Sequence, residues 1–233
     1  MIPISDQNPT RRFPIINYTL IAINVIVFIY ELTLTPPQLD RLISHWGMNS
    51  AAVLQALFNP LSAPLLTWET LITSQFLHAG WAHIIGNMLF LWVFGDNIED
   101  VLGHLGHIAF YFLSGIAAGI AQAFMLGPSL VPSIGASGAI AGVLGAYLLL
   151  YPMVRINILF PLFILFWTIE IPAVVVIGWW FIQQFFYGIT ALSDAAASGI
   201  AFWAHIGGFV AGMILILPFI GRAHRRRPSV YYG

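Results

Sequence analysis

Long apolar segments dominate this sequence and restrict its fold more than any other feature. Only 7% of the 233 residues are charged, whereas a soluble domain of this size carries about 25%. Apolar runs near 20 residues long match the thickness of a bilayer. The sequence therefore predicts an all-α polytopic membrane protein with six transmembrane helices. The six apolar segments lie at residues 15–34, 84–95, 105–126, 138–151, 173–189 and 200–220.

The arginines set the expected orientation of these helices. Arg11 and Arg12 precede the first segment as in a signal peptide, but no small-residue cleavage site follows, so we interpret this segment as a retained span. Arg155 follows the fourth segment, and an arginine cluster at 222–227 follows the last. Arginines favour the cytoplasmic side, which places both termini in the cytoplasm and requires an even number of spans.

The six spans are expected to form one domain at residues 15–220. A cytoplasmic segment at 1–14 precedes it, and a basic cytoplasmic tail at 221–233 follows it, with arginines suited to anionic lipid headgroups. The first outer loop, at 35–82, is long and mixed in polarity, so parts of it should lie in the membrane interface. A chain of this kind without an organellar presequence is expected in the cell (plasma) membrane.

Two further segments affect the count of spans. Residues 156–169 would reach only about 21 Å as a helix, against a hydrocarbon core of about 30 Å. They either flank the fifth span at the interface or add a second crossing, and the arginine distribution favours the first alternative. Residues 96–104 are expected to be an inner loop, although they are acidic and contain no arginine.

Composition excludes several classes of function. The net charge of −1 provides no basic surface for nucleic acid, so no nucleic-acid partner is expected. Cysteine is absent, which removes disulfides, thiolate catalysis and cysteine-based zinc sites. His104 and His107 have helical spacing, but no third metal ligand lies nearby in the sequence. We therefore expect no metal and no cofactor.

Ser137 lies in the glycine-flanked sequence GASGA, at the start of the fourth apolar segment. The fifteen residues from here to Pro152 span about 22 Å as a helix, roughly 8 Å less than the hydrocarbon core. The preceding loop must therefore dip into the membrane, which is tolerated only if it is buried in protein or lines a watered cavity. Ser137 is expected to face such a depression.

Three other polar residues are expected at a similar depth. His205 lies about five residues into the sixth segment, which is again roughly 8 Å below the surface. His83 and Asn87 begin the second segment at positions i and i+4 and so share one helix face. Since these segments enter from the same side, the four side chains should converge.

Small residues on the fourth and sixth segments should let these two helices approach closely. Their spacing of four residues places them on one face of each helix. The residues are Gly138, Gly142 and Ala146, with Ser137, Ala141 and Gly145 beside them, and Ala204, Gly208 and Gly212 on the sixth segment.

The four polar residues have the chemistry needed for acyl transfer. Histidine is the usual base for a serine nucleophile, and Asn87 and His83 offer donors for an oxyanion. No carboxylate is expected near His205, so the sequence predicts a Ser–His dyad. Purely structural roles stay open as alternatives. Ser137 could serve simply as the cap of its helix, and His83, Asn87 and His205 could serve simply to join neighbouring helices.

Three ordered motifs carry a family resemblance: FLHAGWAHIIGNMLFLWVFGDNIEDVLG, then GASGAIAGVLGAY, then AHIGGFVAG. Over about residues 67–220 the chain resembles the rhomboid serine proteases. The resemblance implies a six-helix rhomboid-like bundle with a long first outer loop and peptide-bond cleavage inside the membrane. It implies a Ser137–His205 dyad, oxyanion positions at Asn87 and His83, and no metal or cofactor. The implied substrates are single-span transmembrane proteins cut near the outer face of the membrane.

The chain departs from the family pattern in two places. Many relatives have Trp-Arg where this chain has Trp68-Glu69, which affects the anchoring of the first loop. Some have an aromatic residue where this chain has Ala141, which removes a ring that could stack on His205. The resemblance also implies that substrates enter beside the fifth span, at about 173–199.

Two other functions are possible for a chain of this kind. A transporter or channel would have polar residues across the full depth of the membrane, whereas here they gather at one level. A catalytically inactive relative that only binds membrane proteins would be expected to lack the serine or the histidine, and this chain has both.

Overall fold

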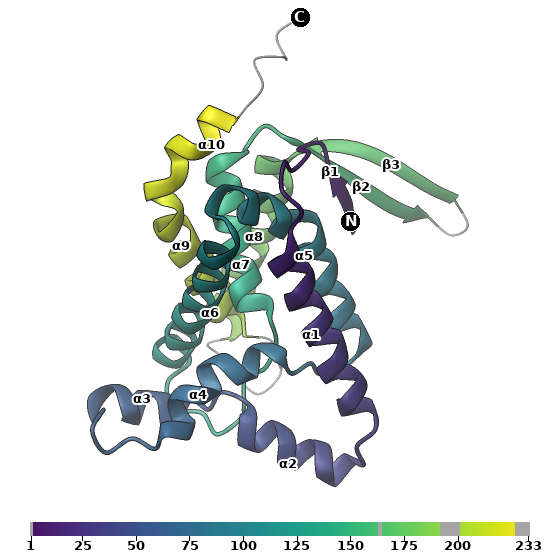
Figure 1. The fold of residues 1–233 in the computed structure, drawn as a ribbon. Coiled ribbons are helices and arrows are strands. Elements are labelled where there is room, and N and C mark those ends of the chain that lie inside the picture. Colours follow the sequence, from purple (N-terminus) through teal and green to yellow (C-terminus); the bar gives the residue numbers. More distant parts are fainter. Residues whose placement is uncertain (1, 163–164, 192–200, 227–233) are drawn as a thin grey trace, which may run out of the picture.

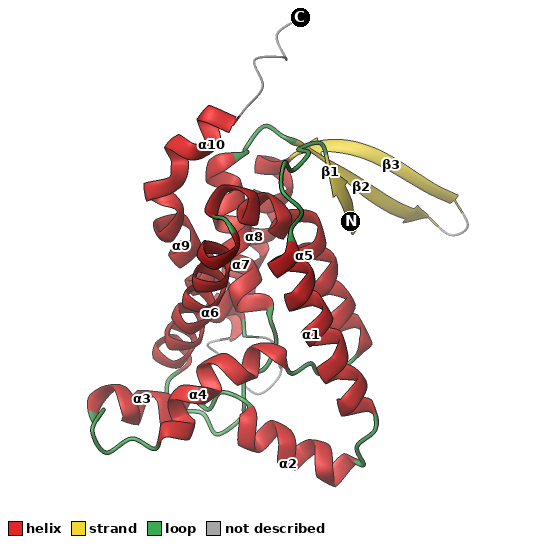
Figure 2. Ribbon diagram, in the orientation of Figure 1, coloured by secondary structure: helices red, strands yellow, loops and turns green. Residues whose placement is uncertain are grey.

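A computed structural model describes residues 2–162, 165–191 and 201–226 of the chain. A bundle of helices forms most of the described structure, and the strands lie together at one side (Figure 2). The helices are α1 (Ile15–Leu32), α2 (Pro36–Trp46), α3 (Ser50–Phe58), α4 (Leu65–Thr73), α5 (Trp81–Leu102), α6 (His104–Leu126), α7 (Ser137–Leu150), α8 (Ala173–Ala191), α9 (Phe202–Ile216) and α10 (Ile220–Arg226). Short 3₁₀ turns are η1 (Ser74–Phe76) and η2 (Leu217–Phe219), and the strands are β1 (Ile2–Asp6), β2 (Arg155–Leu162) and β3 (Leu165–Pro172).

The bundle has two different ends (Figure 1). Helices α2, α3 and α4 lie at one end, which we call the loop end, and the strands lie at the other, the sheet end. Helices α5, α7 and α9 all begin at the loop end and run toward the sheet end. Their parallel course brings the predicted polar residues to one level.

The lengths of the helices fit a bilayer, so the chain is an integral membrane protein of mainly helical structure. Among the described residues, α1, α6, α8 and the stretch from α9 to Ala223 are long and apolar enough to cross. The segment Leu65–Phe76 joins α5 at a bend of 86°, and this pair also qualifies when taken together. Helix α7 has only 14 residues and is too short for this test. A helix stands at each of the six predicted places, while the count of six crossings stays a prediction.

The predicted inner loop at 96–104 is wrong. Helix α5 continues to Leu102, and α6 begins at His104, so only Gly103 separates them, with a φ of +76°. Glu99 is buried and accepts hydrogen bonds from the backbone N–H groups of Ile16 (3.0 Å) and Asn17 (2.7 Å). A carboxylate at the first turn of α1 stabilises that helix. The acidic residues of this segment therefore include a partner for a helix end.

A three-stranded antiparallel sheet replaces both alternatives for residues 156–169. Its order is β1–β2–β3, with Ile2 opposite Leu159 and Arg155 opposite Pro172. Ile156 and Ile158 are fully buried, and their alternation with polar neighbours is typical of a strand rather than a helix. Apolar length alone does not distinguish such strands from a short helix, so neither the sheet nor a strand within residues 1–14 was predicted.

Hydrogen bonds join the sheet to the bundle. The Tyr147 hydroxyl on α7 donates to the Asp6 carboxylate over 2.5 Å, and Asn97 on α5 donates to the same group over 3.1 Å. Burial beside these helices raises the pKa of Asp6 to about 7. Strand β1 is therefore anchored to the helices through Asp6.

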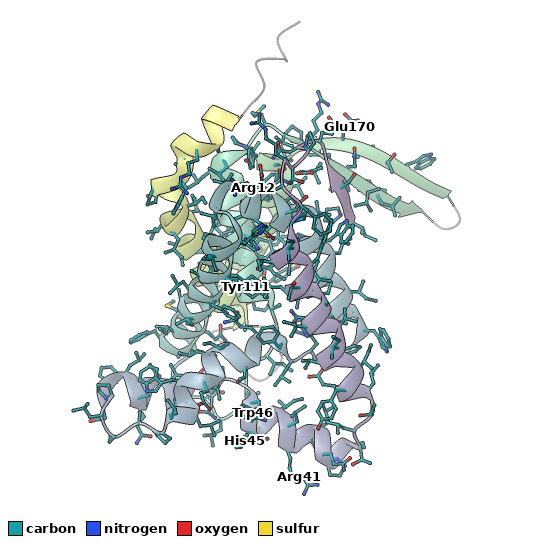
Figure 3. All side chains as sticks on the ribbon, viewed as in Figure 1. Arg12, Arg41, His45, Trp46, Tyr111 and Glu170 are labelled. Carbon is teal, nitrogen blue, oxygen red and sulfur yellow. The ribbon has the colours of Figure 1, made fainter. Side chains whose placement is uncertain are left out.

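Charged residues lie at both ends of the molecule (Figure 3). Arg12 and Glu170 lie at the sheet end, Arg41 lies at the loop end on α2, and Tyr111 is buried between them. Arg155 and Glu170 form an exposed ion pair of 3.7 Å between β2 and β3. Arg41 departs from the one-sided arginine distribution on which the predicted orientation depends.

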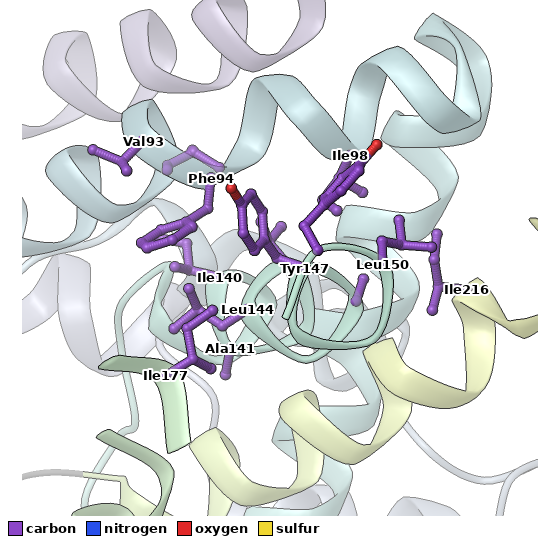
Figure 4. Close-up of a cluster of buried hydrophobic side chains, with 14 of the residues drawn as sticks. Val93, Phe94, Ile98, Ile140, Ala141, Leu144, Tyr147, Leu150, Ile177 and Ile216 are labelled. Atoms are coloured by element: carbon purple, nitrogen blue, oxygen red, sulfur yellow. The ribbon is translucent and has the colours of Figure 1, made fainter. Parts of the chain in front are cut away.

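Helix α7 lies in the middle of the core, where most of its residues are buried. Figure 4 shows side chains of α7 packed against its neighbours, with Ile140, Leu144 and Tyr147 beside Phe94 and Ile98 of α5 and Ile177 of α8. Phe94 and Tyr147 meet edge to face with ring centroids 5.0 Å apart. The core therefore holds the helix that begins with Ser137 from several sides.

The predicted small-residue faces of α7 and α9 are in contact. A methyl group on Gly208 would collide with the carbonyl oxygen of Gly138, and one on Gly212 would collide with that of Gly142. Backbones can approach this closely only when side chains are absent. The glycines therefore set the separation of the two helices that carry Ser137 and His205.

We expect Gly212→Ala to lower the free energy of unfolding by about 1–3 kcal/mol, because the added methyl group must push α7 and α9 apart. Thermal unfolding in detergent measures the change. Gly178→Ala on α8 is the matched control, since a methyl group there meets no atom within 4 Å among the described residues. Equal melting temperatures for the two variants would contradict the packing described here.

Candidate active site

Ser137 and His205 meet at the loop end of the bundle. Ser137 is the first residue of α7, and His205 lies in the first turn of α9 with 8% of its surface exposed. The Ser137 hydroxyl and the His205 Nε2 atom are 2.7 Å apart, within hydrogen-bond distance. The structure therefore brings together the two residues that the sequence analysis pairs.

The other ring nitrogen of His205 has a partner that the sequence analysis did not identify. His205 Nδ1 lies 2.7 Å from the side-chain oxygen of Gln184 on α8. An amide oxygen only accepts hydrogen bonds, so Nδ1 must carry the proton and Nε2 is free to accept from Ser137. A signal for this partner was present in the sequence, because Gln183 and Gln184 interrupt an otherwise apolar helix.

No carboxylate is expected near His205, and the acidic residues nearest to it in the sequence are Asp194 and Glu170. Glu170 lies on β3 at the sheet end, far from the dyad along the bundle, as expected. Asp194 lies outside the described residues. The partner of His205 in the described structure is thus a neutral amide.

Two aromatic rings border the His205 imidazole. The Trp180 ring of α8 lies 5.8 Å away, tilted by 39°, and the Phe202 ring of α9 meets it edge-on at 6.4 Å. Position 141 on α7, where some relatives have an aromatic residue, is Ala141 and contributes no ring. Trp180 therefore supplies from α8 an aromatic contact that the sequence analysis expected to be missing.

His83 and Asn87 of α5 lie close to the loop that precedes Ser137. The backbone N–H of Ala79 donates to His83 Nδ1 over 3.4 Å, which leaves Nε2 as the protonated nitrogen. A methyl group on Gly135 would lie 2.6 Å from His83 Nε2 and 3.7 Å from Asn87 Nδ2. The two predicted oxyanion residues therefore point donors at the same place, next to the start of α7.

The Asn87 amide donor is buried and has no hydrogen-bond partner among the described residues. A buried polar group in this condition costs free energy, about 1–3 kcal/mol. Such a donor fits a site that receives an acceptor only when a substrate or a reaction intermediate is present.

A cavity of about 820 Å³ opens at these side chains. Its size is within the range of ligand sites in proteins. Residues from α5, α6, α8, α9 and the loop at 129–134 contribute to its wall, which is mainly apolar. Ser137 faces this cavity, together with His83, Asn87, Trp180, Gln184 and His205.

The arrangement provides a nucleophile, a base and hydrogen-bond donors beside one cavity, which are the groups needed for acyl transfer. Within residues 2–162, 165–191 and 201–226, histidines and carboxylates form no group of three that could hold a metal ion.

Comparison with known proteins matches residues 66–222 to the Rhomboid domain. The chain is 36% identical over 75 residues to Rhomboid-like protein 11, chloroplastic, of Arabidopsis thaliana, covering 32% of this chain and 26% of that protein. It is 32% identical over 136 residues to Rhomboid protease GluP of Bacillus subtilis, covering 58% and 24%. It is 26% identical over 227 residues to Rhomboid protease AarA of Providencia stuartii, covering 90% and 74%. The chain thus spans about a quarter of the length of the first two.

Proposed function

Because the chain belongs to the rhomboid family, we propose that it is an intramembrane serine endopeptidase that cleaves transmembrane proteins through a Ser137–His205 dyad. The match to the Rhomboid domain covers more than half of the chain. The observation that carries the proposal is the 2.7 Å contact between the Ser137 hydroxyl and His205 Nε2 at the wall of a cavity.

The proposed reaction begins when a peptide bond of the substrate enters the cavity beside Ser137. His205 Nε2 takes the hydroxyl proton while the Ser137 oxygen attacks the carbonyl carbon. The protonated imidazole then gives that proton to the leaving amine, which breaks the peptide bond and leaves an acyl ester on Ser137. Water, activated by the same nitrogen, hydrolyses the ester and restores the hydroxyl.

Three donors are proposed to stabilise the oxyanion of this reaction. They are His83 Nε2–H, the Asn87 amide and the backbone N–H of Ser137 at the first position of α7. The unpartnered state of the Asn87 donor supports this role, since no protein bond must break before it binds the oxyanion. The N-terminus of α7 adds the favourable end of a helix dipole.

Gly135→Ala should slow cleavage about 10²-fold, because the new methyl group would displace His83 from the oxyanion site. Gly135 has a φ of +122°, so backbone strain also contributes. Gly127→Ala is the matched control, since Gly127 has a φ of +76° but no atom within 4 Å of the added methyl group in the described structure. Initial rates on one substrate measure both variants. If Gly127→Ala slowed cleavage as much as Gly135→Ala, backbone strain alone would explain the loss of rate, and the contact with His83 would not be needed.

The proposed substrates are single-span transmembrane proteins, cut near the outer face of the membrane. Ser137 begins a helix of only 14 residues, about 21 Å long, so a scissile bond at Ser137 would lie below one membrane surface.

We assign the loop end to the outer face, both termini to the cytoplasm, and the protein to the plasma membrane. The arginine side chains at the sheet end, of which Arg222 lies over the Phe219 ring at 4.8 Å, would then meet anionic lipid.

Reconstitution into liposomes with a single-span substrate tests the proposal. We expect the substrate to be cut at one or few bonds near the outer membrane face, as determined by mass spectrometry of the products. A substrate that stays whole would overturn the protease proposal. An ion-flux assay on the same liposomes would then test the transporter alternative, and retention of the whole substrate on the protein would favour a binding role.

A further inference from the structure

We propose that Gln184 is a positioning residue that fixes the tautomer and the orientation of His205. The inference rests on the proposed proteolytic function and adds to it a third side chain, contributed by α8. In this arrangement the Gln184 side-chain oxygen holds the proton on Nδ1, so that Nε2 stays available for the Ser137 proton.

The geometry uses both nitrogens of the ring at once. Nδ1 and Nε2 each make a contact of 2.7 Å, one to Gln184 and one to Ser137, on opposite sides of the imidazole. The rings of Trp180 and Phe202 restrict its remaining freedom. An imidazole without the Gln184 contact could carry its proton on Nε2, where it would be unable to act as the base.

A neutral partner suits this cavity. His83 and Tyr187 are the other titratable groups in its wall, and the described lining residues include no Asp, Glu, Lys or Arg. A carboxylate in an apolar wall would have to lose its hydration, which is costly without a fixed opposite charge. The amide dipole accepts the Nδ1 proton without this cost, and it also favours the imidazolium that forms during the reaction, although less than a full charge would.

The contact between Gln184 and His205 also makes the geometry of the dyad depend on the position of α8. Helix α8 packs on α9 through Trp180 and Phe181 against Phe209, and through Tyr187 against Phe202. Its opposite side, with Trp179 and Phe186, is exposed in the described structure. Gln184 therefore orients His205 only while α8 is packed against α9.

The test compares three variants of the full chain on a single-span substrate. Gln184→Met keeps the length of the side chain and removes the amide, Gln184→Glu keeps an acceptor oxygen, and Gln183→Met is the matched control on the neighbouring position. We expect Gln184→Met to lower kcat roughly tenfold to 100-fold with KM nearly unchanged. Gln184→Glu should recover most of the rate and move the acidic limb of the pH profile upward, because a carboxylate favours the protonated imidazole. Gln183→Met should behave like the wild type.

Nitrogen NMR of the His205 ring provides a readout that does not depend on proteolysis. We expect protonated Nδ1 in the wild type and a mixture of tautomers in Gln184→Met, with the signals assigned through His205→Ala. If Gln184→Met kept the kcat and the His205 tautomer of the wild type, the inference would be wrong while the protease proposal stayed intact. If Gln184→Met and Gln183→Met lost kcat equally, the inference would also be wrong, because altered packing of α8 would then explain both losses. A wild-type protein that cuts no substrate would instead contradict the proposed function, and the inference with it.

Discussion

Ser137→Ala is expected to abolish cleavage of a single-span substrate and labelling by a fluorophosphonate probe. The probe reacts with an activated serine oxygen, and the variant has none at the site, so the rate should fall by a factor of roughly 10⁴ or more. The cleavage rate of His205→Ala should fall by a similar factor, since the Ser137 hydroxyl loses the base that lies 2.7 Å away. Quantified labelling and product formation, on proteins with equal melting temperatures, measure both effects.

Ser133→Ala is the matched control for this experiment. Ser133 lines the same cavity from the preceding loop, whereas the hydroxyl in contact with His205 Nε2 is that of Ser137. We expect it to label and cleave like the wild type. If labelling persisted in Ser137→Ala and disappeared in Ser133→Ala, the nucleophile would be Ser133, and the assignment to Ser137 would be wrong.

Asn87→Ala is expected to slow cleavage by about 10²–10³-fold, which corresponds to about 3–4 kcal/mol of the activation barrier. The reason is the loss of one donor to the oxyanion, so the effect should appear in kcat rather than in KM. Asn87→Asp tests the same point with a side chain of equal size, because an ionised carboxylate has no donor and would repel the oxyanion. It should be at least as slow as Asn87→Ala.

Thermal unfolding separates this catalytic role from a structural one. The Asn87 amide nitrogen has no partner among the described residues, so its removal breaks no native hydrogen bond at that atom, and the melting temperature of Asn87→Ala should stay close to that of the wild type. A lower melting temperature with an unchanged rate would mean that Asn87 only joins helices.

Much of the helical framework could be predicted from the sequence, because apolar length and small-residue spacing are local properties. Helices α1, α6 and α8 begin and end close to the predicted bounds, and Gly208 and Gly212 contact α7 as predicted. The sheet could not be predicted in this way. Strand β1 pairs with β2, a segment far from it in the sequence, and a strand depends on such neighbours more than a helix does.

The candidate site was predictable to the extent that motifs mark it. The sequence brought out Ser137 and His205, and the structure places them in contact. Gln184 and Trp180 were missed because they lie on α8, and their meeting with His205 depends on how that helix is rotated against α9. Rotation between two mainly apolar helices is set by packing of many side chains, and no short sequence pattern reports it.

The pairing of β1 with β2 has a consequence for how the protein is made. Ile2 lies opposite Leu159, so the strand near the start of the chain must wait until the ribosome has produced everything up to α7 and the hairpin. Contacts this distant along a polypeptide form slowly, since the intervening loop must be closed first. During translation, Asp6 would thus remain in water and ionised, and it would enter its buried position beside Tyr147 only when membrane insertion of the first helices is complete.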